Sequence, residues 1–203
     1  NQKSLYQEKD NPNAFSYEVL KHINDYVEDK KKHYGKDIPY IAAIYGTPAE
    51  SLCGTQVEQF KKKYGIIHHV SDRAYFTNSF HMHVSENITP FEKQDAEFRY
   101  FHLASGGHIQ YCRFTTGMNE EYIAQCVTRA MKLGYYFGVN IDKSYCNDCG
   151  AQIDDGIDTC PVCHGHNITE INRVCGYLGY SKVSGTTKMN DAKMAEIHDR
   201  KSM

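Results

Sequence analysis

Hydrophobic positions in the first 141 residues recur with the period of a helix in several segments. Residues 15–33 place Val19, Leu20, Ile23 and Val27 on one face, with Lys and Asp on the other. Three later segments carry helix patterns of their own: one that follows residue 47 and ends near Gly65, one that starts at Thr89, and residues 119–134. The segment from Thr89 has Pro90 at the first helical position and Glu92 three residues after the cap, an order that predicts a capping box. We expect that helix to close at Gly106 and Gly107.

Short apolar or aromatic runs separate these helices and predict strands. They lie at residues 38–46, 73–84, 108–114 and 135–141. Strands that alternate with helices indicate an α/β layer or part of an α/β barrel.

The pattern changes near residue 142, where Cys, Asp, Gly and Asn become frequent and long apolar runs end. Such a segment is typical of a fold that a metal organises instead of an apolar core. We therefore expect a main domain over residues 1–141 and a small domain over residues 142–203.

Two cysteine pairs begin the second segment. Cys146 and Cys149 form one pair and Cys160 and Cys163 the other, with ten residues between the pairs. Two such pairs supply the tetrahedral set of thiolates that a structural Zn²⁺ accepts, and a filled four-sulfur site has no open position for catalysis. His164 or His166 could replace one sulfur, and the spacing alone also allows iron. We expect Cys53, Cys112 and Cys126 to be small buried apolar residues.

Composition and charge limit the partners. The 203 residues carry a net charge of −2, which provides no broad basic surface for nucleic acid. No apolar run approaches the roughly 20 residues that cross a membrane, and no signal peptide is recognisable. Eight cysteines without a secretion signal favour reduced thiols, so we expect a cytoplasmic protein. The start at Asn1 suggests a fragment of a longer protein.

The stretch Arg173–Gly179, "RVCGYLG", resembles the signature of glycyl-radical enzymes. With the cysteine pairs immediately before it, the chain is similar to the anaerobic (class III) ribonucleoside-triphosphate reductases. The segments "YGTPAESLCG", "YFTNSFHMHV", "TPFEK", "ASGGHIQY" and "NDAKMAEIHDR" agree with that resemblance, which covers the chain from about residue 39 onward.

The resemblance implies the C-terminal half of a ten-stranded α/β barrel, followed by a zinc-ribbon and radical-loop domain. Gly176 would store a radical after an activating enzyme, which carries an iron-sulfur cluster and S-adenosylmethionine, removes a hydrogen from its Cα. The thiyl cysteine that acts on the ribonucleoside triphosphate would lie in the remaining N-terminal part of the reductase. The resemblance also implies that the full protein is a homodimer. The electron donor and the nucleotide preference stay open.

A loop of five residues precedes the second predicted helix: Thr47, Pro48, Ala49, Glu50 and Ser51. The free N–H groups at a helix start favour an anion, and the resemblance implies that this loop holds substrate phosphates. A plain helix cap explains the same residues equally well.

Two other functions fit parts of the sequence. One is a zinc-ribbon interaction module in which Gly176 only forms a turn. The other is a stand-alone subunit that repairs an oxygen-cleaved radical enzyme. Electron paramagnetic resonance of the activated chain separates the zinc-ribbon module from a radical function.

Overall fold

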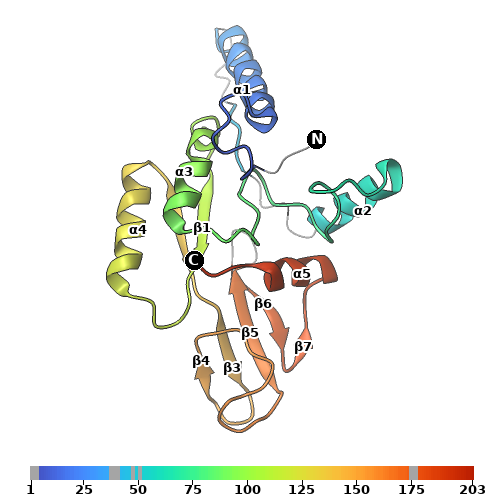
Figure 1. Ribbon diagram of the computed structural model, residues 1–203, viewed down its shortest axis with the longest axis vertical. Helices are drawn as coiled ribbons and strands as arrows, with labels where there is room; N and C mark the ends of the chain where they lie inside the picture. Colours follow the sequence, from blue (N-terminus) through green and yellow to red (C-terminus); the bar gives the residue numbers. More distant parts are fainter. Residues whose placement is uncertain (1–4, 37–41, 47–48, 50–51, 174–177) are drawn as a thin grey trace.

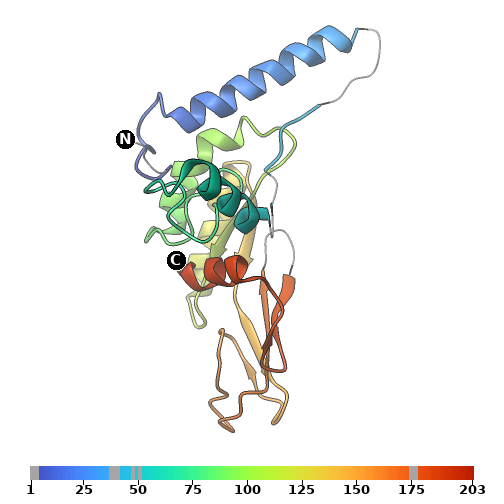
Figure 2. The ribbon, with the colours of Figure 1, turned by 90° about the vertical axis from the view of Figure 1, so that its right-hand side faces the viewer.

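The computed structural model describes residues 5–36, 42–46, 49, 52–173 and 178–203. In these ranges the chain forms a mixed α/β part and an antiparallel sheet that extends away from it (Figure 1). The C-terminal helix returns to the α/β part (Figure 2). None of the helices in the described ranges is long and apolar enough to cross a membrane.

Among the residues that the structure describes, the α/β part contains four helices and one pair of strands. These are α1 (Phe15–Tyr34), α2 (Leu52–Tyr64), α3 (Pro90–Phe101), β1 (Ile109–Arg113), α4 (Glu120–Lys132) and β2 (Tyr136–Asn140). β1 and β2 are parallel and in register from Ile109 opposite Tyr136 to Arg113 opposite Asn140. Because α4 connects them, these three elements form a β–α–β unit.

The ends of the helices follow the capping signals in the sequence. Thr89 accepts from the Glu92 N–H, and the Glu92 carboxylate accepts from the Thr89 N–H, so the predicted capping box is confirmed. α3 ends at Phe101, earlier than the expected Gly106, and a turn leads into β1. α4 is followed by Gly134 with a φ of 79°, a conformation that glycine adopts without strain.

One expected strand is absent and another is only partly described. Residues 73–84 form turns, so the strand prediction there is wrong. The Met82 N–H donates to the carboxylate of Glu97 instead of a strand partner, and Ser79 has a φ of 51°. Of the segment 38–46, residues 42–46 are described, and Tyr45 makes a parallel bridge to Gly107 just before β1.

The core of the α/β part contains the cysteines expected there. Cys112 and Cys126 are fully buried and pack with Phe114, while Cys53 is a buried residue of α2. Burial raises the pKa of the Cys112 thiol to about 12. All three cysteines are therefore buried, as predicted, and the Cys53 thiol also donates to the side-chain oxygen of Asn78 at 2.9 Å.

The first helix, α1, keeps its apolar face in solvent. Phe15 is 78% exposed, and no residue of α1 is buried. The N-terminal end of α1 contacts α3, where the hydroxyls of Ser16 and Tyr100 lie 2.8 Å apart. The amphipathic pattern predicted the helix correctly.

The second region is a sheet of five short antiparallel strands in the order β4-β3-β5-β6-β7. Their bounds are β3 (Lys143–Cys146), β4 (Gln152–Ile153), β5 (Ile168–Arg173), β6 (Leu178–Val183) and β7 (Thr186–Thr187). α5 (Asp191–Asp199) follows the sheet and packs against α2. The Tyr75 hydroxyl donates to the Asp199 carboxylate at 2.8 Å, so α5 also contacts the loop before α3.

Candidate functional site

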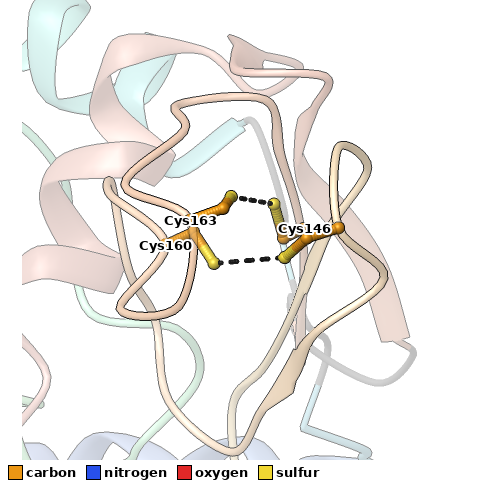
Figure 3. A group of neighbouring side chains, drawn as sticks. Cys146, Cys160 and Cys163 are labelled. Carbon is orange, nitrogen blue, oxygen red and sulfur yellow. Dashed lines mark hydrogen bonds between the residues drawn. The ribbon is translucent and has the colours of Figure 1, made fainter.

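The four paired cysteines converge at one end of the antiparallel sheet. Figure 3 shows sulfur atoms from the two pairs directed at one another. The sulfur of Cys146 lies 3.6 Å from that of Cys163, and the sulfur of Cys149 lies 3.7 Å from that of Cys160. All four sulfurs lie within 4.8 Å of one another. A tetrahedron with Zn–S bonds of about 2.3 Å has edges of about 3.8 Å, so the four thiols fit a zinc ion.

The two cysteine pairs lie on turns of the same construction. In the first turn the Gly150 N–H donates to the Cys146 carbonyl at 2.9 Å, and in the second the His164 N–H donates to the Cys160 carbonyl at 2.9 Å. The last residue of each turn is left-handed, with φ values of 77° at Gly150 and 59° at His164. His164 therefore has a backbone role, and the described cluster contains sulfur ligands alone.

The electrostatics of the cluster favour a bound cation. The N–H groups of Cys163 and Val162 lower the pKa of Cys160 to about 7, which favours its thiolate. At Cys163 the Gly165 N–H lowers the pKa, but the neighbouring sulfurs of Cys149 and Cys146 outweigh it and raise the value to about 12. The four thiols cannot all ionise at neutral pH unless a positive ion offsets their charge.

The segment that contains Gly176 starts at the opposite end of β5 from the cysteines. Ile168 begins β5 opposite Cys146, and Arg173 ends it opposite Leu178 of β6. At about 3.3 Å per residue these two ends of β5 lie about 17 Å apart. Residues 174–177, with Gly176, lie outside the described residues. We call the pair Arg173 and Leu178 the stem of that segment.

The stem is attached to the α/β part and to α5. The Arg173 guanidinium lies 4.9 Å from the centre of the Tyr111 ring on β1, within the range of a cation–π interaction. The Arg173 carbonyl accepts from Arg200 Nη1 at 2.6 Å, and Arg200 Nη2 donates to Glu196 at 2.8 Å. The stem is therefore held by residues remote from the cysteines.

A cavity of about 360 Å³ lies beside the stem. Its lining includes Gly46, His81, His108, Tyr111, Arg173 and Arg200. Burial lowers the pKa of His108 to about 3, so this imidazole is neutral at physiological pH. Neither ring nitrogen of His108 has a hydrogen-bond partner among the described residues.

The carboxylate of Glu97 lies behind this cavity and is fully buried. Its oxygens accept from the Lys93 ammonium, from the Met82 N–H at 2.7 Å and from Gln110 at 2.9 Å. His81 lies 3.5 Å from the same carboxylate. His81, Glu97 and His108 bring possible ligand atoms within 4.8 Å of one another, and the Lys93 ammonium already balances the charge of Glu97.

The predicted phosphate loop is described at Ala49 alone. Thr47, Pro48, Glu50 and Ser51 lie outside the described residues. Ala49 has a φ of 45°, and its carbonyl accepts from the N–H of Leu52, the first residue of α2.

The sequence interpretation did not include Arg200 and Glu196, although their spacing of four residues is a recognisable signal for an ion pair at the end of a helix.

Comparison with known proteins places the chain in a family. The family model described as "Anaerobic ribonucleoside-triphosphate reductase" matches residues 2–203. The reductase of that name from phage T4 is 33% identical over 199 residues, which are 90% of this chain and 30% of the phage protein. The one from Haemophilus influenzae is 32% identical over 172 residues, with 79% of this chain and 23% of that protein covered.

Solved structures agree in fold. A structure titled "Anaerobic ribonucleotide reductase" matches with a TM-score of 0.68 at 21% identity and covers 91% of this chain and 28% of its own. A structure of the Thermotoga maritima anaerobic ribonucleotide reductase in complex with dATP and CTP matches with a TM-score of 0.61 at 23% identity. It covers 80% of this chain and 25% of its own.

The fold of the described residues is thus similar to that of solved anaerobic ribonucleotide reductases. The chain belongs to the anaerobic ribonucleoside-triphosphate reductase family. It spans roughly a quarter of the length of the curated relatives it matches, between 23% and 30%. The family match extends far beyond the cysteine segment, which favours a reductase over an independent zinc-ribbon module.

Proposed function

We propose that this chain supplies the radical-storage part of an anaerobic ribonucleotide reductase, which converts ribonucleoside triphosphates to 2′-deoxyribonucleoside triphosphates. Gly176 would carry the stored radical. The observation that carries the proposal is the family match over residues 2–203, which includes the segment around Gly176. The paired strand ends at Arg173 and Leu178 support it, because Arg173, which precedes that segment, contacts Tyr111 of the α/β part.

Glycine suits this role for a physical reason. Removal of a hydrogen from its Cα leaves an unpaired electron between an amide nitrogen and a carbonyl, which delocalise it. A side chain would hinder the planar centre and its close packing. The activating enzyme, a partner with an iron-sulfur cluster, would accept this hydrogen through S-adenosylmethionine.

Residues 1–141 would form the C-terminal portion of the α/β catalytic barrel, and residues 142–203 the zinc-ribbon and radical domain. The parallel pair β1–β2 supports the barrel, because α4 connects its strands, and the bridge from Tyr45 to Gly107 is a second parallel contact. The loop Thr47, Pro48, Ala49, Glu50 and Ser51 would bind substrate phosphates at the start of α2.

Cys146, Cys149, Cys160 and Cys163 would hold one structural Zn²⁺. Four sulfur ligands leave the ion no open coordination position, so it would supply folding energy to the sheet and take no part in the chemistry. The remaining N-terminal part of the reductase would provide the thiyl cysteine. We expect the whole enzyme to be a homodimer that works in the cytoplasm.

The decisive experiment is spectroscopic. The chain, joined to the rest of its reductase, is incubated anaerobically with the activating enzyme and S-adenosylmethionine, and an electron paramagnetic resonance spectrum is recorded. We expect a doublet from one α-hydrogen, and cleavage of the chain at residue 176 after exposure to air.

Gly176→Ala should abolish both signals. Gly156→Ala is the matched control, because an added Cβ there meets Glu170 no closer than 3.4 Å. The control should keep the doublet. An activated sample without a radical, or a doublet that persists in Gly176→Ala, contradicts the proposal.

A further inference from the structure

We propose that Arg200, oriented by Glu196, is a positioning residue that fixes the stem of the segment 174–177 against the α/β part. The inference rests on the proposed function, since it concerns where Gly176 is presented for radical transfer. According to this inference, contacts with α5 and β1, and not the cysteine cluster, determine the precise position of the stem.

The geometry requires an arginine. One arm of the Arg200 guanidinium donates to the Arg173 carbonyl at 2.6 Å, and the other donates to the Glu196 carboxylate at 2.8 Å. The side chains of Arg200 and Glu196 are 12% and 5% exposed, so water competes weakly for these bonds. A planar guanidinium makes both bonds at once, whereas a lysine ammonium at the end of a flexible chain lacks this fork.

Glu196 is itself held in place. Its carboxylate accepts from Lys193 at 2.5 Å and from the side-chain amide of Asn78 at 3.3 Å. Asn78 belongs to the loop that precedes α3. Contacts with the α/β part therefore help to set the orientation of Arg200.

The backbone around Arg200 is also attached to the α/β part. The Arg200 carbonyl accepts from Arg113 at the end of β1 at 3.1 Å. The Lys201 N–H donates to the Val84 carbonyl at 2.9 Å, and the Met203 N–H donates to the Arg113 carbonyl at 2.8 Å. Arg200 therefore projects from a segment that is fixed on both sides, as a support for Arg173 must be.

A second contact restrains Arg173 from another direction. Its guanidinium lies over the Tyr111 ring of β1, while its carbonyl is held by Arg200. Two supports at one residue thus restrain the Arg173 end of the stem. Loss of the Arg200 support should leave the zinc site intact and displace the stem.

The consequence for catalysis is specific. Radical transfer depends steeply on geometry, and a misplacement of about 1 Å can cost about 100-fold in rate. Removal of the hydrogen by the activating enzyme requires the glycine to reach a different protein. A looser stem should therefore reduce turnover per radical far more than the yield of radical.

The first test needs no radical. Hydrogen exchange is followed in the zinc-loaded full protein for amides of residues 168–183. In Arg200→Ala we expect exchange at Arg173 and at the start of β6 to be at least about 10-fold faster, with the Ile168 end unchanged. Arg129→Ala is the matched control, because Arg129 makes comparable bonds to Asp95 and Gln94 on α3, far from the stem along the chain.

The second test measures deoxyribonucleotide formed per unpaired electron. Arg200→Ala should keep radical per chain within about twofold and lose about 10- to 100-fold in turnover per radical. The turnover per radical of Arg200→Lys and of Glu196→Gln should lie between the values for Arg200→Ala and the wild type. The turnover per radical of Arg129→Ala should match that of the wild type.

Unchanged exchange at the stem in Arg200→Ala overturns the inference, as does a loss of radical and turnover in equal proportion, which indicates a merely structural role. If the wild type forms no radical, the proposed function fails, whereas the exchange measurement still decides whether Arg200 holds the stem.

Discussion

The α/β part and the antiparallel sheet both bury polar side chains, but only the α/β part also buries several large apolar ones. The interior of the α/β part contains large apolar side chains such as Tyr100, Phe114 and Met82, all of them fully buried. The sheet buries Ile168 with Cys146 and Cys160, and its other interior positions are polar: Ser144, Glu170, Asn172 and Ser181. A region this small with so little apolar surface cannot offset its conformational entropy by burial alone. We therefore expect the α/β part to depend on its apolar core and the sheet on a metal bound by its cysteines.

Removal of the metal should give the largest effect. Structural zinc sites contribute apparent free energies of about 10–16 kcal/mol in small peptides. We expect chelation, or the double change Cys146→Ser with Cys163→Ser, to abolish the binding of about one zinc per chain. Protection from hydrogen exchange should be lost over residues 143–187 and retained in β1, α4 and β2.

The paired change Cys112→Ser with Cys126→Ser is a control from the other region, where both thiols are buried. It should destabilise the α/β part without a change in zinc content. Retained protection of the sheet in a metal-free sample would contradict the contrast between the two regions.

The converse change is Glu97→Gln, which should affect the α/β part alone. The Glu97 carboxylate is fully buried and is the partner of the buried Lys93 ammonium. Loss of one member of a buried ion pair typically costs about 3–5 kcal/mol, because the other charge stays buried without compensation. Denaturant unfolding of the zinc-loaded protein measures the loss.

Glu121→Gln at the exposed start of α4 is the matched control and should change the free energy of unfolding by less than about 0.5 kcal/mol. Equal zinc content in both variants is required. A zinc loss in Glu97→Gln would show that the two regions are not independent.

The sequence predicted elements where local patterns decide the structure. The capping box at Thr89 and the periodic apolar face of residues 119–134 correspond to α3 and α4. The cysteine spacing likewise predicted one cluster, because a pair separated by two residues converges on its own turn.

The elements that sequence reasoning missed depend on contacts between distant residues. The aromatic run 73–84 has strand composition, but its donors go to partners such as Glu97. The strands β3 to β7 are short and polar, so they carry no alternating apolar signal. Arg200 and Arg173 are 27 residues apart, and no local pattern connects them.

Acid should destabilise the α/β part through His108. Burial holds the pKa of His108 at about 3 in the folded state, against 6.5 for an exposed histidine. The unfolded chain therefore binds the proton more strongly between these values, and stability falls as the pH drops from 6.5 towards 3. We expect His108 to account for a loss of about 1.5 kcal/mol between pH 6.5 and pH 5.

His108→Asn, compared with the wild type by denaturant unfolding at a series of pH values, should flatten this dependence. His198→Asn is the control, because His198 has a 91% exposed side chain. An identical slope in His108→Asn and the wild type would rule out His108 as the source.

The smallest effect distinguishes the two cysteine turns within the sheet. Gly150 and His164 occupy equivalent left-handed positions, but only glycine adopts that conformation without a steric cost of about 1 kcal/mol. Gly150→Ala should therefore destabilise the zinc-loaded sheet by about 1 kcal/mol. His164→Gly should be neutral or stabilise it by up to about 0.5 kcal/mol, because relief of strain is partly offset by the entropy of the unfolded glycine.

A steric clash does not complicate this comparison, because a Cβ at Gly150 would meet the Tyr145 hydroxyl only at 3.8 Å. Competition with a chromophoric chelator measures zinc affinity, and a stabilisation of 0.5 kcal/mol appears as a factor of about two. A loss of about 1 kcal/mol or more in His164→Gly would mean that side-chain contacts of His164 outweigh the cost of its left-handed backbone. Effects of opposite sign would identify backbone conformation as the property that both turns share.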